Sequence, residues 1–159
     1  MSLRTKAKKN SKEYKTVVKM VNKCLRHLSR KEYGIIRNYA SAKGVAESIL
    51  EVYPDYVRSR AGSSRIMIST HRSNFGYMEN KGVFVEYAAF NDHPTIGKFK
   101  GTPIDCLFAL VAHEVSDHVQ YRYLRYDPRY RHMYSKPHGD GFKLIYNILR
   151  RDLVNPLGG

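Results

Sequence analysis

The feature that most limits the fold is a long helix-forming segment in the second half of the 159-residue chain. Thr102, Pro103 and Asp105 supply a capping hydroxyl, a proline at the first helical position and an acid at the third, which together mark a helix start. Apolar residues then recur at helical spacing, namely Ile104, Leu107, Phe108, Val111, Val115 and Val119. The sequence therefore predicts a helix from residue 102 to about residue 124, with this apolar stripe against the core.

The polar residues of the same helix match a zinc-site motif at all but one of its defined positions. His113 and Glu114 match the start of the H-E-x-x-H pattern of thermolysin-type sites, but Asp117 stands where the second histidine belongs. Residues four apart lie about 40° apart around a helix, so His113 and Asp117 share a face and can reach one ion. His118 lies about 140° from His113 by the same geometry. We interpret His118 as a histidine at the core edge, bonded to Glu114, and not as a ligand.

A catalytic zinc ion needs a third protein ligand and one open position for water, and it accepts carboxylate oxygen. His138 is the candidate, because Gly139 and Gly141 let the backbone approach closely beside it. The same residues also allow an interpretation without a metal site. In that case Asp117 is a solvated acid on the helix surface, and His138 is a surface histidine beside a helix start capped by Asp140.

The rest of the chain predicts one α+β domain with N-terminal helices, a small β-sheet, the helix of the metal site and a C-terminal helix. Ser11 caps a first helix that ends near Leu28, and a second helix spans residues 41–52 before Pro54. Residues 65–70 and 82–87 are predicted strands, residues 91–94 a loop, and residues 141–153 the last helix. Residues 1–10 are predicted to be a flexible basic arm, residues 11–153 the domain, and residues 154–159 a tail.

Positive charge is concentrated at the N-terminus. Residues 1–31 contain eleven Lys or Arg and one acid, within a net charge of +14 for the chain. On the first predicted helix, basic residues form a stripe opposite the apolar face, at Lys12, Lys15, Lys19, Lys23, Arg26 and Arg30. Such asymmetry predicts a polyanionic partner, DNA or another nucleic acid; the alternative is a solvated basic face that aids solubility.

A second basic segment, residues 121–134, alternates tyrosines with Arg122, Arg125, Arg129 and Arg131. The tyrosines are suited to stacking on unpaired bases while the arginines hold phosphates. Because the segment lies between the predicted ligands, it could instead line a substrate cleft. A third interpretation is that the tyrosines pack a long loop onto the domain.

The chain has only two cysteines, no run of about 18 apolar residues and no apolar segment of a secretory signal. Two cysteines argue against a disulfide scaffold and fit a reducing compartment. The sequence therefore predicts a cytoplasmic or nucleoid-associated protein that does not enter a membrane.

Two short motifs together resemble the SprT-like, or Spartan-type, zinc metallopeptidase domain over residues 11–153. They are residues 110–114 (LVAHE), in an apolar helix, and residues 138–142 (HGDGF), which open the last helix. The resemblance implies a zincin-like fold, a zinc ion (Zn²⁺) held by His113 and His138, and Glu114 as general base. It also implies a protein substrate, notably protein crosslinked to DNA.

The sequence departs from that family at two points. Asp117 replaces the family's second histidine, which leaves a catalytically inactive SprT-like fold with a nucleic-acid-binding or structural role as the alternative. The cysteine-rich module that follows the protease domain in many relatives is absent from this chain. DNA binding would then depend on the basic N-terminal helix and on residues 121–134.

Overall fold

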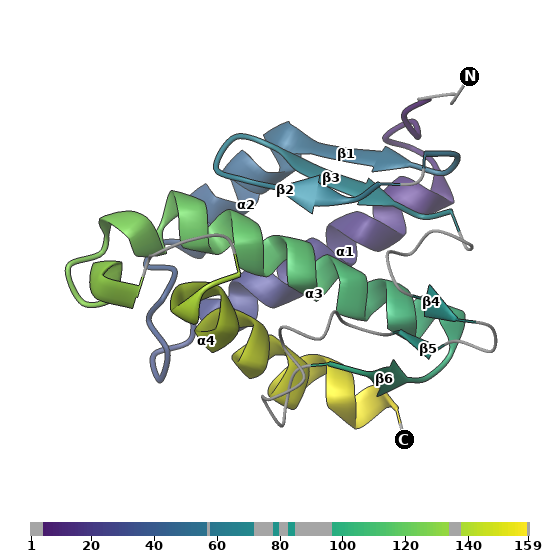
Figure 1. The fold of residues 1–159 in the computed structure, drawn as a ribbon. Coiled ribbons are helices and arrows are strands. Elements are labelled where there is room, and N and C mark those ends of the chain that lie inside the picture. The colour runs from purple at the N-terminus through teal and green to yellow at the C-terminus, as the bar shows by residue number, and fades with distance from the viewer. Residues whose placement is uncertain are drawn as a thin grey trace.

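The computed structural model describes residues 5–56, 58–71, 78–79, 83–84, 97–133 and 138–158. It is an α+β fold built around one central helix, α3, which spans Pro103–Arg122. In Figure 1, α3 crosses the middle of the molecule, with a small sheet on one side, α4 on the other and α1 behind. None of the helices in the described ranges has both the length and the apolar composition needed to cross a membrane.

The start of α3 confirms the local prediction. The Thr102 hydroxyl accepts from the Asp105 N–H, and the Asp105 carboxylate accepts from the Thr102 N–H, so both groups of a capping box are present. The predicted single apolar stripe is wrong, because every residue from Cys106 to Gln120 is buried while Ile104 is 51% exposed. Elements pack around the whole circumference of the helix, so its polar residues are enclosed as well.

The first helix also follows the prediction. α1 spans Lys12–Leu28, and the Ser11 hydroxyl accepts the N–H of Tyr14 at its start. Its apolar face is buried, and its lysines project from the opposite side. The predicted arm is fixed at one described point, since the Ala7 N–H donates to the Val52 carbonyl at 2.7 Å.

The second helix is shorter than predicted. α2 spans Tyr39–Ile49, and residues 50–52, predicted to continue it, belong instead to strand β1, Leu50–Tyr53. β1 pairs in parallel with β3, Ile66–Ser69, and Leu50 lies opposite Ile66. The sheet order is β1-β3-β2, with β2, Arg60–Ala61, antiparallel to β3. The predicted strand at 65–70 is confirmed. The helix prediction failed because pairing with a strand sixteen residues away is not visible in local periodicity.

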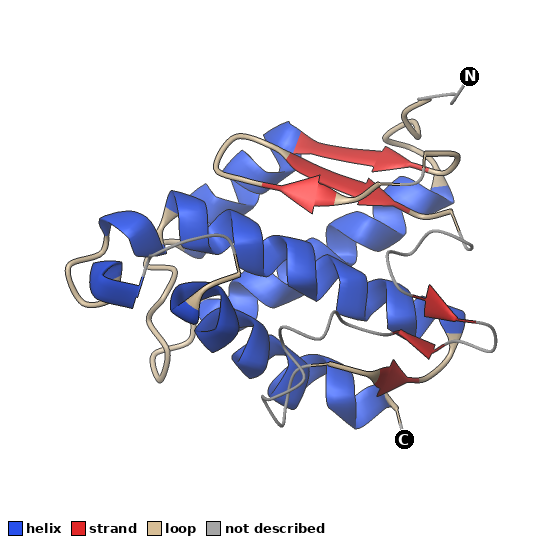
Figure 2. Ribbon diagram, in the orientation of Figure 1, coloured by secondary structure: helices blue, strands red, loops and turns tan. Residues whose placement is uncertain are grey.

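A second, antiparallel sheet lies at the N-terminal end of α3. It contains β4, Met78–Glu79, β5, Val83–Phe84, and β6, Phe99–Lys100. Figure 2 shows the two sheets at separate places against the helices. Of the predicted strand 82–87, only residues 83–84 are described, and the predicted loop 91–94 lies outside the described residues.

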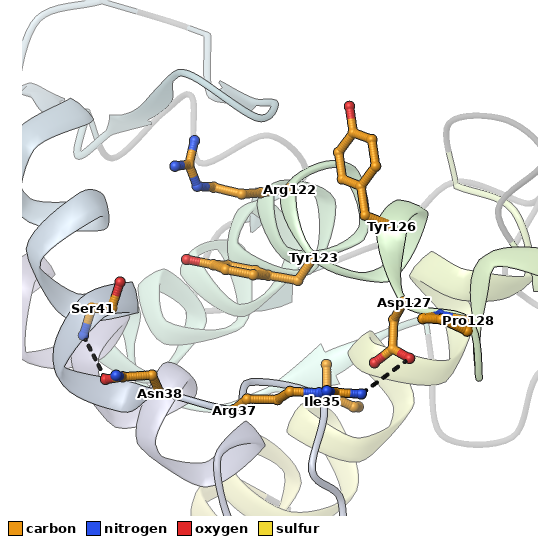
Figure 3. Close-up of a pocket in the computed structure, with 9 residues that line it drawn as sticks. All are labelled: Ile35, Arg37, Asn38, Ser41, Arg122, Tyr123, Tyr126, Asp127 and Pro128. Carbon is orange, nitrogen blue, oxygen red and sulfur yellow. Dashed lines mark hydrogen bonds and ion pairs between the residues drawn. The ribbon is translucent and has the colours of Figure 1, made fainter.

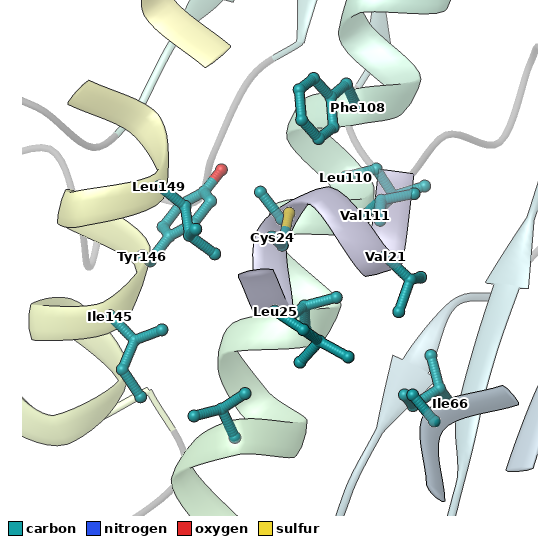
Figure 4. Close-up of a cluster of buried hydrophobic side chains, with 14 of the residues drawn as sticks. Val21, Cys24, Leu25, Ile66, Phe108, Leu110, Val111, Ile145, Tyr146 and Leu149 are labelled. Carbon is teal, nitrogen blue, oxygen red and sulfur yellow. The ribbon is translucent and has the colours of Figure 1, made fainter. Parts of the chain in front are cut away.

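The last helix, α4, spans Asp140–Leu149 and continues as a π-helical turn, Arg150–Val154. Its apolar face closes a core shared with α1, α3 and β3 (Figure 4). The labelled core side chains are Val21, Cys24, Leu25, Ile66, Phe108, Leu110, Val111, Ile145, Tyr146 and Leu149. Short 3-10 turns at Leu124–Tyr126 and Arg131–Met133 link α3 to the segment before α4.

The close approach of α4 to α3 depends on Gly141. The N–H of Phe142 donates to Gln120 Oε1 at 2.7 Å inside the core. A Cβ at position 141 would lie 2.7 Å from that oxygen and 2.8 Å from Leu124 Cδ2. Because both neighbours are fully buried, neither can move away without disturbing the packing.

We therefore expect Gly141→Ala to lower the free energy of unfolding by about 1–3 kcal/mol, the usual range for overpacking. Gly44→Ala is the matched control, since Gly44 lies inside α2 and a Cβ there meets nothing within 4 Å. That variant should instead gain up to about 1 kcal/mol from helix propensity. Urea unfolding of both variants tests the pair, and equal effects would contradict it.

Candidate metal centre

Three side chains converge where α3 meets the start of α4. His113 Nε2 lies 3.2 Å from His138 Nε2 and 3.6 Å from Asp117 Oδ2, and His138 Nε2 lies 3.3 Å from Asp117 Oδ2. Zinc bonds of about 2.0–2.1 Å place tetrahedral ligand atoms about 3.3–3.4 Å apart. The three measured separations match those edges, and this group could hold a metal ion. The predicted set of three ligands is thus consistent with the geometry.

Two of the three groups come from α3. His113 and Asp117 lie one helical turn apart, and each side chain is less than a tenth exposed. Enclosure of a carboxylate costs free energy unless its oxygens have partners. Asp117 Oδ2 faces the two imidazoles, but Oδ1 is buried with no hydrogen-bond partner. A cation at this position would compensate the buried negative charge.

His138 enters from the segment before α4 and remains partly exposed. Its φ of +59° lies in the left-handed region, where it is the only non-glycine residue in the described part of the chain. That conformation is uncommon for residues with a side chain and tends to persist where surrounding contacts require it. Gly139 caps α4 directly after it. The strained backbone turns the imidazole toward α3.

An aromatic wall encloses the inner side of the centre. The ring centroid of His113 lies 4.9 Å from Phe142 and 5.4 Å from Tyr146, and His138 lies 4.7 Å from Phe142. The bond from Gln120 to Phe142 holds this wall in place. Residues Phe142 and Tyr146 were missed as site residues, although their four-residue spacing places them on one face of α4.

Arg150 fixes the outer end of the wall. Its guanidinium is buried and donates to the hydroxyl of Tyr146 at 3.1 Å. It also donates to the carbonyls of Gly97 and Lys98, which lead into β6. One buried cation thereby connects the aromatic wall to the second sheet.

His118 lies outside the centre. It is fully buried, and its Nδ1–H donates to the carbonyl of Gly62, just after β2, at 2.8 Å. The predicted bond to Glu114 is therefore wrong: His118 fastens α3 to the first sheet. Burial lowers the pKa of His118 and favours the neutral imidazole. The prediction that His118 is not a ligand agrees with the composition of the candidate group.

Glu114, the predicted general base, is buried beside the centre on α3. It lies about 100° around the helix from His113 and about 60° from Asp117. The candidate ligand group does not include it. This placement leaves Glu114 next to the ligands without making it one of them.

The basic residues predicted to bind nucleic acid are all exposed, but they differ in their partners. On α1, Lys12, Lys15 and Lys19 form no ion pair within the described ranges. Arg26 lies over the ring of Tyr39, with 4.7 Å from its guanidinium to the ring centroid, and Arg30 pairs with Glu32. The charge stripe on α1 is therefore open to solvent along most of its length.

Arg129, in the second basic segment, is committed to a structural role. It donates to both Asp127 oxygens and to the Gly34 carbonyl, which joins this segment to the turn after α1. These hydrogen bonds hold the pKa of Asp127 at about 2, against an ordinary value of 3.8. Arg129 is therefore already bonded to internal acceptors, and its contact with phosphate stays a prediction.

The remaining members of that segment have mixed roles. Tyr130 packs on the core and donates to the Tyr33 carbonyl at 3.3 Å, whereas Tyr126 is exposed. Arg122 donates to the Ser63 carbonyl at 3.4 Å, and Arg125 lies over the Tyr126 ring. Arg131 is exposed, and residue 134 lies outside the described part of the chain.

Ligand variants test the centre. We expect Asp117→Asn and His138→Ala to weaken zinc binding by more than the roughly 10–100-fold that loss of an outer partner causes. His118→Ala should retain zinc while losing about 2 kcal/mol of stability, because it removes a buried hydrogen bond and leaves a cavity. Zinc competition titration and urea unfolding measure the two effects. If His118→Ala abolishes zinc binding and Asp117→Asn does not, the ligand assignment is wrong.

The Asp127 carboxylate should make stability depend on acid pH. Because folding lowers its pKa, the ionised group stabilises the fold above about pH 4, and this stabilisation is lost as the pH falls toward 2. Asp127→Asn should cost about 1 kcal/mol at pH 7, since Arg129 is half exposed and water screens the pair. Asp55→Asn, at an exposed acid, is the control. Equal acid unfolding of both variants and wild type would contradict the assignment.

Comparison with known proteins adds no relative to this picture. No family model, no curated protein and no solved structure matches the chain. The features of the chain that bear on function are the centre formed by His113, Asp117 and His138 and the charged surface.

Proposed function

We propose that this protein is a zinc-dependent endopeptidase of the SprT-like type that acts on proteins associated with nucleic acid. The observation that carries the proposal is the triangle of His113, Asp117 and His138, with ligand-atom separations of 3.2, 3.3 and 3.6 Å. Two imidazoles and one carboxylate are a ligand set used by catalytic zinc, and three protein ligands leave one position open.

The donor atoms favour zinc over harder cations. Calcium and magnesium prefer shells made entirely of oxygen, whereas two of these three donors are imidazole nitrogens. Zinc binds an imidazole only through a ring nitrogen that carries no proton, here the nitrogens of His113 and His138 that face Asp117. Binding should therefore weaken at acid pH as protons compete for those nitrogens.

The residues around the centre suit peptide hydrolysis. A zinc ion bound there would supply Lewis-acid polarisation of a peptide carbonyl and lower the pKa of a bound water. Glu114 would accept a proton from the attacking water and return it to the departing amine nitrogen. Phe142 and Tyr146 would exclude bulk water from the inner side and strengthen the local electrostatic interactions.

The charged surface supports the nucleic-acid part of the proposal. Lys12, Lys15, Lys19 and Lys23 project from the solvent side of α1, whose 17 residues extend about 25 Å. The four lysines span about 17 Å of this helix, and a positive face of that length is suited to a phosphate backbone. The same observation favours a second candidate function, a nucleic-acid-binding protein on this fold that does not cut peptides.

Replacement of Glu114 distinguishes the two functions. We expect Glu114→Gln to fold and to bind zinc like wild type, but to cleave an unfolded protein at least about 100-fold more slowly, because it lacks the base. Glu13→Gln, at an exposed acid on α1, is the matched control and should retain activity. Both are assayed with and without DNA, and a chelator should abolish wild-type cleavage. If wild type is as inactive as Glu114→Gln under all these conditions, the second function replaces the first.

A further inference from the structure

A pocket of about 370 Å³ opens between the start of α2 and the end of α3, and none of its residues belongs to the metal centre. Figure 3 shows its lining side chains, which come from residues 35–41 and 122–128. Its volume is within the range of small-ligand sites. These two segments meet only in the tertiary structure, so sequence patterns gave no indication of it.

Aromatic rings form one side of the pocket. Tyr126 is 69% exposed, which is high for a large ring, and Tyr123 is half-buried. In Figure 3 the Tyr123 ring extends from the end of α3 toward Asn38 and Ser41 of α2. Neither tyrosine hydroxyl has a hydrogen-bond partner within the described part of the chain. The Arg125 guanidinium lies over one face of the Tyr126 ring, 5.3 Å from its centroid, so the opposite face of that ring and the exposed part of Tyr123 are available beside polar groups.

The charge of the pocket is positive. Arg37 has a side chain that is 72% exposed, and Arg122 is exposed on the opposite wall. The one lining acid, Asp127, is neutralised by Arg129 at 2.8 Å, while Arg37 approaches it only to 3.8 Å. Both lining arginines can therefore pair with an anion without losing a strong internal salt bridge.

A contact between Arg26 and Tyr39 connects the basic face of α1 to the segment that lines the pocket. The guanidinium of Arg26, in the last turn of α1, lies 4.7 Å from the ring centroid of Tyr39 and donates to its hydroxyl at 3.4 Å. Tyr39 follows directly after Asn38, a lining residue that caps α2 by accepting from the Ser41 N–H. The Arg26–Tyr39 contact therefore lies between the basic face of α1 and the lining residue Asn38.

We propose that the pocket takes an unpaired base of a single-stranded nucleic acid whose phosphate backbone continues along the lysine face of α1. The base stacks on Tyr126 and Tyr123, Arg37 and Arg122 hold the flanking phosphates, and Asn38 and Ser41 face the base edge. The inference rests on the nucleic-acid partner of the proposed function and specifies its form. An acidic peptide would satisfy the arginines but would leave the two ring faces without a stacking partner.

The test is fluorescence anisotropy with three labelled probes: a twelve-nucleotide oligothymidine, a twelve-base-pair duplex and an oligoglutamate peptide. We expect wild type to bind the single strand more tightly than the duplex. Tyr126→Leu, which keeps apolar area but removes the aromatic face, should weaken single-strand binding about 5-fold or more and leave duplex binding unchanged. Tyr126→Phe should bind like wild type.

The charged residues give a second, separable readout. Arg37→Gln should reduce the slope of log affinity against log salt for the single strand by about 0.7, one phosphate contact, whereas Tyr126→Leu should leave the slope unchanged. Arg58→Gln, an exposed arginine outside the pocket, is the charge control and should change neither affinity nor slope. Neutralising Lys15, Lys19 and Lys23 together should weaken both nucleic-acid probes.

Several outcomes would overturn the inference. They are equal binding of the single strand by wild type and Tyr126→Leu, equal affinity of wild type for strand and duplex, and tighter binding of oligoglutamate than of the strand. The last result would assign the pocket to acidic peptides. Because the measurement involves no cleavage, an inactive metal centre leaves its result unchanged, and failure of the peptidase proposal is seen separately with Glu114→Gln.

Discussion

The complete enclosure of α3 is the constraint on which the rest of the structure depends. A helix buried from Cys106 to Gln120 cannot leave its polar side chains in water, and several of them bond to neighbouring elements. His118 donates to the Gly62 carbonyl after β2. Gln120 accepts the N–H of Phe142 in the first turn of α4, and Asp117 faces His138. The polar residues of one helix therefore position the sheet, the last helix and the metal centre.

That arrangement also explains how the three candidate ligands come together. His138 occupies a left-handed backbone conformation between the helix that carries its partners and the helix that it precedes. The hydrogen bond from the Phe142 N–H to Gln120 and the absence of a Cβ at Gly141 let α4 approach α3 closely. His138 thereby comes within contact distance of His113 and Asp117. A shift of α4 would separate the three ligand atoms, so packing of the core and geometry of the centre are coupled.

The positive charges separate into structural and available groups. Arg129 and Arg150 are held by internal acceptors, and each joins two segments that lie far apart in the sequence. The lysines of α1 face solvent, and so do Arg37 and Arg122, which line a pocket with two exposed or half-exposed tyrosines. Net charge alone could not distinguish these groups, because the distinction depends on which carbonyls and carboxylates the fold brings within reach.

Local signals in the sequence determined what depends on neighbours along the chain. Ser11 and the residues 102–105 specified the starts of α1 and α3, and the spacing of His113 and Asp117 specified a shared helix face. The tertiary structure alone decided that residues 50–53 pair as a strand, that α3 is buried on every side, and that Arg129 donates to the distant Gly34 carbonyl. It also formed the pocket between α2 and the end of α3. The physical reason is the range of the interactions: caps and helical faces involve residues within a few positions, whereas strand pairing, enclosure and the hydrogen bond from Arg129 to Gly34 depend on contacts between distant segments.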